Sequence, residues 1–236
     1  MKETNWDRWG AATGYLVFAL GVAAATFERG APLANAPVEA TLAFVAAYRT
    51  ELRVQSLLFV LSAGVYLWWF GSLRSFLLRA EGEPGRLATV AFGAGVSWAG
   101  LQLVLQSAQV ALAMGSGGDV APGLAGMIGD LTYAISVIAY VPMAIMLAAV
   151  AVISWRTGVL LAWLGWLSAI TAATNLCMSL GIVVDSGPLV PGGTLTYALY
   201  ALMVVWLVAV TTVMVVRLGR PTNSRAISAT PANLHG

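Results

Sequence analysis

The hydrophobic positions of this chain fall into six long continuous runs, none of which contains Lys, Arg, Asp, Glu or His. A helix needs ~20 apolar residues to cross the hydrocarbon core of a bilayer. Because the apolar residues are continuous and do not alternate with polar ones, they predict helices and not the strands of a membrane barrel. The runs span residues 9–27, 54–73, 87–113, 131–153, 159–183 and 195–216.

This pattern predicts an all-α fold, a bundle of six transmembrane helices. We expect one transmembrane domain over residues 1–220 and a disordered, polar cytoplasmic tail over 221–236. The first run could also be a signal peptide, since a small-residue site stands at Ala34–Ala36. Pro37 would directly follow the cleavage site, and Glu3 and Asp7 reduce the positive charge that a signal peptide carries before its apolar run. We therefore expect this run to be retained as a membrane helix.

Composition supports a membrane location. The chain of 236 residues is 59% hydrophobic and 9% charged, whereas soluble domains carry roughly 25% charged residues. One lysine against eleven arginines, with many alanines and glycines, is typical of a GC-rich bacterial genome. We therefore expect a multi-pass protein of the bacterial cytoplasmic membrane whose partner is the lipid bilayer. No basic block suggests nucleic-acid binding.

The basic residues predict the orientation, because cytoplasmic loops are enriched in Lys and Arg. With the N-terminus inside, nine basic residues lie in the inner segments and three in the outer ones, namely Arg29, Arg49 and Arg53. Both termini are therefore expected in the cytoplasm. The same orientation places Trp68, Trp69, Trp163 and Trp166 as aromatic residues at the inner interface.

Two outer connections carry further signals. Pro37 suits a first helical turn, and Val38, Leu42, Val45 and Leu52 fall near one face, which predicts a short amphipathic outer helix. The alternative is an N-terminal extension of the second span. Met114–Gly129 is rich in glycine and is expected to be a loop.

Small residues at Gly10 and Gly14, and at Gly93, Ser97 and Gly100, predict close helix packing within the chain or between copies.

With no charge in the runs, uncharged polar side chains must carry any site in the membrane. Gln102, Gln106 and Gln109 share one helix face at spacings of four and three residues. An amide in hydrocarbon must find hydrogen-bond partners, so this face should point into the bundle. Other polar residues are expected at a similar depth on the other spans, namely Gln55, Tyr133, Asn175 and Tyr197, with Tyr140 nearer the middle of the membrane.

These eight residues allow two interpretations. They form a pocket that opens toward the outer leaflet and binds a neutral or amphiphilic molecule through hydrogen bonds. Alternatively, they bond one another and hold the helices together, as interhelical polar contacts commonly do. Pro142 interrupts the fourth run and could shape the floor of such a cavity.

Three acids lie near the expected mouth of this pocket. Asp130 precedes the fourth run at an N-cap position, where a carboxylate binds free backbone N–H groups. Glu28 ends the first run, and Asp185 follows the fifth, where the helix dipole does not favour an anion. In an enzyme of this kind, Asp130, Asp185 or Glu28 would be the catalytic acid.

Cysteine and histidine restrict the remaining chemistry. Cys177 is the single cysteine, which excludes an intrachain disulfide, and His235 is the single histidine. Haem or zinc ligated by histidine inside the membrane is therefore excluded, and we expect neither a cofactor nor a metal site.

Three segments carry a resemblance to a known group of proteins: Trp69–Arg74, Glu81–Leu87 and Phe92–Gly95. In these segments and in the order of its first elements, the first half of the chain resembles a broad set of bacterial multi-pass membrane proteins grouped under domain-of-unknown-function labels. The resemblance implies the topology and supplies no activity, ligand or catalytic residue.

Three functional hypotheses follow. The first is a membrane protein that binds or helps to move a small apolar or amphiphilic molecule. The second is an enzyme acting on a hydrophobic substrate, such as an acid-initiated terpenoid cyclase or an isomerase, with tyrosines that steady a developing cation. The third is a structural or regulatory partner of another membrane protein, or a homo-oligomer held by its small residues.

Overall fold

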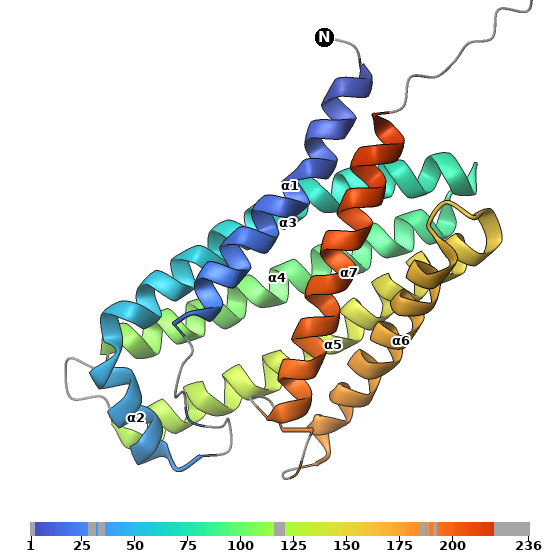
Figure 1. Cartoon of the computed structure of the whole chain (residues 1–236). Coiled ribbons are helices and arrows are strands. Elements are labelled where there is room, and N and C mark those ends of the chain that lie inside the picture. Colours follow the sequence, from blue (N-terminus) through green and yellow to red (C-terminus); the bar gives the residue numbers. More distant parts are fainter. Residues whose placement is uncertain are drawn as a thin grey trace, which may run out of the picture.

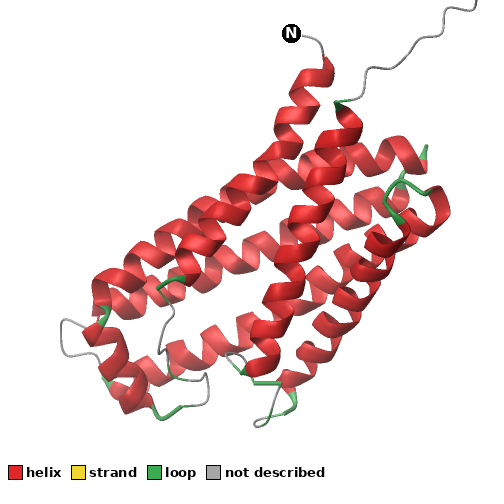
Figure 2. Cartoon of the chain, in the orientation of Figure 1, coloured by secondary structure: helices red, strands yellow, loops and turns green. Residues whose placement is uncertain are grey.

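The fold consists of helices throughout the part of the chain that the structure describes (Figures 1 and 2). The computed structural model describes residues 3–27, 32, 36–115, 121–184, 187, 189–190 and 193–219. The expected tail at 221–236 lies outside these residues. The elements are α1 (Glu3–Ala25), α2 (Val38–Ala47), α3 (Arg49–Glu81), α4 (Arg86–Gly115), α5 (Pro122–Thr157), α6 (Ala162–Met178), the 3-10 helix η1 (Ser179–Ile182) and α7 (Thr194–Leu218).

The prediction of an all-α fold is confirmed for the described residues, and the helices fit a multi-pass membrane protein. Five helical segments are long and apolar enough to cross a membrane: α3, α4, α5, the segment Ala162–Ile182 and α7. Most helices extend beyond the apolar runs. The 33 residues of α3, for example, reach about 50 Å at 1.5 Å per residue, against a hydrocarbon core of about 30 Å. The runs therefore mark only the apolar part of each helix.

Six long helices contact one another in a closed order. In this order α1 packs on α3, α3 on α4, α4 on α5, α5 on α6, α6 on α7, and α7 returns to α1. Sequence neighbours joined by short turns are neighbours in space, as expected for the connection between α5 and α6. The return contact between α7 and α1 joins the two ends of the chain (Figure 1).

Two tryptophans anchor the buried core on one side of this arrangement. Trp69 on α3 is fully buried, and its indole Nε1 donates to Thr211 Oγ1 on α7 at 3.1 Å. Trp206 on α7 donates to Ser168 Oγ on α6 at 2.8 Å. The expectation that Trp69 is an interface residue is therefore wrong, because its N–H finds a partner inside the protein. Trp68, the adjacent residue, is exposed, as are Trp163 and Trp166.

Small residues on α1 allow its close approach to α3 and α7. A side chain at Gly14 would overlap Thr211 Oγ1 and stand 2.6 Å from Trp69 Nε1, and one at Gly10 would overlap Ser72 Oγ. This glycine pair therefore packs within the chain. Gly93 and Gly100 on α4 meet no neighbouring atom within 4 Å and do not pack against another helix of the chain.

Polar contacts tie the helices together at the end that carries the α3–α4 turn. The carboxylate of Glu81 accepts from the backbone N–H of Leu87 at 2.9 Å and of Ala88 at 2.8 Å. It thereby satisfies two of the free donors at the start of α4. Arg79 forms an ion pair with Asp7 of α1 at 2.8 Å.

The opposite end is closed by α2, which is a separate helix (Figure 1). Tyr48 interrupts the helical backbone between α2 and α3, and Val45 and Leu52 form a small buried cluster with the start of α5. The expected loop at 114–129 is wrong at both ends, because α4 continues to Gly115 and α5 already begins at Pro122. For the same reason Asp130 is not an N-cap and lies inside α5.

Exchanging Gly14 for alanine should destabilise the protein. Its Cβ would displace Thr211 and Trp69, and such overpacking costs about 1–3 kcal/mol. Gly21 on the same helix has no atom within 4 Å of the added Cβ, so Gly21→Ala should be neutral or stabilise by up to about 1 kcal/mol. Thermal unfolding in detergent measures both variants. Equal effects of the two exchanges would contradict this account of the packing of α1.

Candidate functional site

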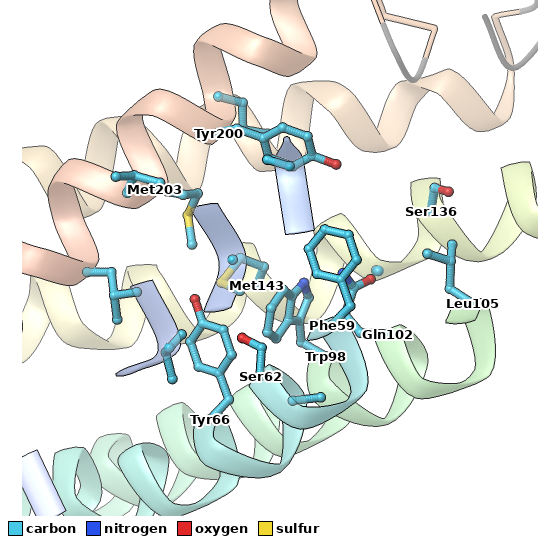
Figure 3. A pocket seen from close by; sticks show the side chains of 18 of the residues that line it. Phe59, Ser62, Tyr66, Trp98, Gln102, Leu105, Ser136, Met143, Tyr200 and Met203 are labelled. Carbon is cyan, nitrogen blue, oxygen red and sulfur yellow. The ribbon is translucent and has the colours of Figure 1, made fainter. Parts of the chain in front are cut away.

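A cavity of about 310 Å³ lies among the six long helices, and each of them contributes to its wall. This volume lies at the lower end of the range of about 300–1,000 Å³ found for small-molecule sites. The wall is largely apolar, with residues such as Val17 of α1, Leu105 of α4 and Leu207 of α7. Figure 3 shows polar and aromatic side chains converging on the same space.

The three glutamines of α4 line this cavity, as their common face predicts. Gln102 is half-buried and Gln106 is 3% exposed. The Nε2 of Gln109 donates to Gln55 Oε1 on α3 at 2.8 Å. The Oε1 of Gln106 is buried and has no hydrogen-bond partner. The stripe therefore combines an interhelical bond at Gln109 with an unpaired amide oxygen at Gln106.

A second stripe on α3 faces the α4 stripe. Gln55, Phe59, Ser62 and Tyr66 recur at spacings of four, three and four residues and so share one face of α3. Phe59, Ser62 and Tyr66 line the same cavity as the α4 glutamines (Figure 3). Of these four residues, only Gln55 was predicted from the sequence as a site residue. The same spacing rule that identified the glutamines could have found the other three residues.

Aromatic rings form one side of the cavity. The ring of Tyr66 lies 5.0 Å from that of Trp98 and 5.3 Å from that of Phe70, and the contact with Trp98 is edge-to-face. Such contacts hold the rings in defined positions. Met143 of α5 and Met203 of α7 line the same space (Figure 3). Their unbranched side chains can adapt to ligands of different shape.

A second cavity of about 330 Å³ lies toward α2. It is lined by residues of α2, α3, α4, α5 and α7, with a larger share of polar groups than the first. Gln109, Ser136 and Tyr200 line both cavities, so the two spaces meet at these side chains. The site thus extends from the middle of the helices to the end covered by α2.

All eight residues proposed from the sequence as ligand contacts lie along these two cavities, although their role in binding stays a prediction. Gln102, Gln106, Tyr140 and Asn175 line the first, Gln55, Tyr133 and Tyr197 line the second, and Gln109 lines both.

Besides the bond between Gln55 and Gln109, the structure provides partners for two more of these side chains. The hydroxyl of Tyr133 donates to the backbone carbonyl of Gly181 at 2.9 Å, which ties α5 to the end of η1. The Nδ2 of Asn175 donates to the carbonyl of Thr171 at 2.7 Å. These two donors stabilise the fold, and they are less available to a ligand than the glutamines of α4.

The candidate acids have different positions. Asp130 is exposed and lines the second cavity, and among the described residues that line either cavity it is the one with a charged side chain. Glu28 and Asp185 lie outside the described residues. The aromatic side of the first cavity, at Tyr66 and Trp98, thus has no carboxylate among its described neighbours in the wall.

Comparison with known proteins assigns no family and no function to the chain. The chain matches no family model, no curated protein and no solved structure. The resemblance of its first half to bacterial membrane proteins of unknown function stays a prediction, and the function must be argued from the two cavities.

The bond between Gln109 and Gln55 should couple α3 and α4 energetically. In a double-mutant cycle with Gln55→Leu and Gln109→Leu, we expect a coupling of about 0.6 kcal/mol, and at most about 1.7 kcal/mol, as found for interhelical hydrogen bonds in membranes. Unfolding in mixed detergent micelles measures it. The pair Gln55→Leu and Gln102→Leu is the control, for which additive effects are expected. A coupling near zero for Gln55 and Gln109 would show that this bond does not hold the helices.

Proposed function

We propose that this protein binds, or helps to move, a small apolar or amphiphilic molecule within the membrane. The single observation that carries the proposal is the cavity among the six long helices, lined by Gln102, Gln106 and Gln109. Ligand sites are typically apolar hollows with a few placed polar groups, and this cavity has that composition.

Packing alone does not account for the three glutamines. If they only held helices together, each amide would be expected to bond a side chain or backbone group of another helix. Gln109 has such a bond, to Gln55. Gln106 lines the cavity, and its buried Oε1 has no hydrogen-bond partner. This difference favours the pocket over the purely structural interpretation.

We further propose six transmembrane spans with both termini in the cytoplasm. This topology adds α1 to the five apolar helical segments. In support, α1 packs along α3 and α7, and its apolar part follows Arg8. The basic residues Arg79, Arg156 and Arg217 lie near the ends of α3, α5 and α7. An even number of spans places the two termini on one side.

Reporter fusions test the topology. Green fluorescent protein, which is dark when exported unfolded, should fluoresce when fused before α1 and also when fused after α7. Alkaline phosphatase inserted in the connection 116–120 between α4 and α5 should be active, and the same insertion at Gly158 should be inactive. If α1 does not cross the membrane, the N-terminal fusion will be dark while the C-terminal fusion fluoresces.

The binding function can be tested with lipids extracted from the host membrane and separated into neutral and polar fractions. At least one fraction should raise the melting temperature saturably, by about 2–4 °C for each kcal/mol of binding free energy. Replacing Gln102, Gln106 and Gln109 with leucine should abolish this rise, because the polar contacts of the cavity are lost.

A matched control places three leucines on the exposed face of the same helix, at Ser97, Gly100 and Ser107. This variant introduces the same number of leucines into α4 and should keep the ligand-dependent rise. Full stabilisation of the glutamine variant, or no stabilisation of the native protein by any fraction, would contradict the proposed function.

A further inference from the structure

The central cavity opens on one side of the bundle, between α1 and α7. Among the described residues that line it, the exposed ones are Val22 and Ala25 of α1 and Tyr200 and Val204 of α7. The lining residues of α3, α4, α5 and α6 are buried or half-buried. A residue that lines the cavity and is also exposed lies where the cavity reaches the surface. These four residues therefore form the opening, which we term the α1–α7 mouth.

The contacts between α1 and α7 define which of their residues lie at the same level. A side chain at Gly219 of α7 would stand 3.3 Å from the guanidinium of Arg8 on α1. Farther along α1, the hydroxyls of Tyr15 and Thr212 form a hydrogen bond of 2.9 Å. As the number rises on α1 it falls on α7, so the two helices are antiparallel and pack together over these levels.

Beyond this contact the two helices separate. The same antiparallel register places Val22 level with Val204, about 10 Å past Tyr15 along α1. Both valines are nevertheless exposed, and a Cβ added at Gly21 would meet no atom within 4 Å. Figure 1 shows the divergence of α1 and α7 in the direction of α2. The mouth is therefore a gap between two helices that are in contact elsewhere.

The surroundings of the mouth are apolar. Its four residues fall inside the apolar runs 9–27 and 195–216, and none of them carries a charge. Leu16 and Val205, which are exposed on the same two helices, are apolar as well. In the proposed topology the gap thus faces hydrocarbon in the outer half of the bilayer. A hydrocarbon chain can pass through it without entering water, whereas a hydrated molecule would first have to lose its water.

We propose that the α1–α7 mouth is a lateral entrance from the bilayer, through which the cavity takes up the hydrocarbon chain of an amphiphile of the outer leaflet. The wall behind the mouth suits such a chain, because it is largely apolar and includes the adaptable side chains of Met143 and Met203. This inference rests on the proposed binding function and topology, and it adds the route of entry and the part of the ligand that is bound.

Phosphatidylcholine with bromine on the middle carbons of its chains tests the entrance. Bromine quenches tryptophan at close range, and Trp98 lines the cavity. Each protein is placed in nanodiscs of brominated or unbrominated lipid, with and without the exchange Trp98→Phe. The part of the quenching that Trp98→Phe removes belongs to Trp98, and we expect such a part in the native protein.

Narrowing the mouth should protect Trp98. Gly21→Phe should lower the quenching of Trp98 at least about twofold, because the added ring fills the gap that a chain needs. Val204→Phe fills the same gap from α7 and should act in the same direction. Gly64→Phe is the matched control, since Gly64 of α3 is exposed, has no atom within 4 Å of an added Cβ and lines neither cavity. Its quenching should equal that of the native protein.

The outcomes separate the entrance from the binding function. If brominated chains do not quench Trp98 in the native protein, or quench it equally in Gly21→Phe and Val204→Phe, the lateral entrance is wrong. If a fraction of the host lipids still raises the melting temperature in that case, the binding function stands and the ligand enters elsewhere. If no fraction does so, both proposals are contradicted. The two variants narrow the mouth from different helices, so the failure of one to fold leaves the test decisive.

Discussion

The fold depends on one constraint, that a polar group surrounded by hydrocarbon must find its partner inside the protein. Helices meet this constraint for the backbone, and the closed order of six helices provides an interior for the side chains. Several polar residues of the spans therefore bond another helix in the interior, whereas the exposed Ser97 and Ser107 bond carbonyls of their own helix. Trp69 and Trp206 bond Thr211 and Ser168, and Gln109 bonds Gln55.

The two ends of the interior satisfy this constraint in different ways. Toward the α3–α4 turn, large buried side chains pack together, and the hydrogen bonds of Trp69 and Trp206 join α3, α6 and α7. Toward α2, the interior carries smaller or polar residues such as Ala63, Gln102 and Ser136, and two adjoining cavities remain. The filled end provides the rigidity on which a binding site at the open end can depend.

Helix α1 contacts both of these regions, the filled core and the central cavity. Glycine at positions 10 and 14 brings α1 against Ser72, Trp69 and Thr211, and the same helix continues past this contact to line the central cavity with Val17 and Phe18. The ion pair between Asp7 and Arg79 is exposed and contributes little free energy. Close packing, more than charge, therefore holds α1 in the closed order.

The sequence by itself determined the helical class, five of the apolar segments and the common face of Gln102, Gln106 and Gln109, because hydropathy and helical spacing are local properties. It missed the early start of α5 and thus the position of Asp130, since a glycine-rich stretch can also be helical when it packs, as Ala125 does in a cluster with Val45. It also misplaced Trp69 and left out Ser62, Tyr66 and Trp98. Only the tertiary structure decided which amide is paired and which amide oxygen is left without a partner, because that depends on the helix that lies opposite.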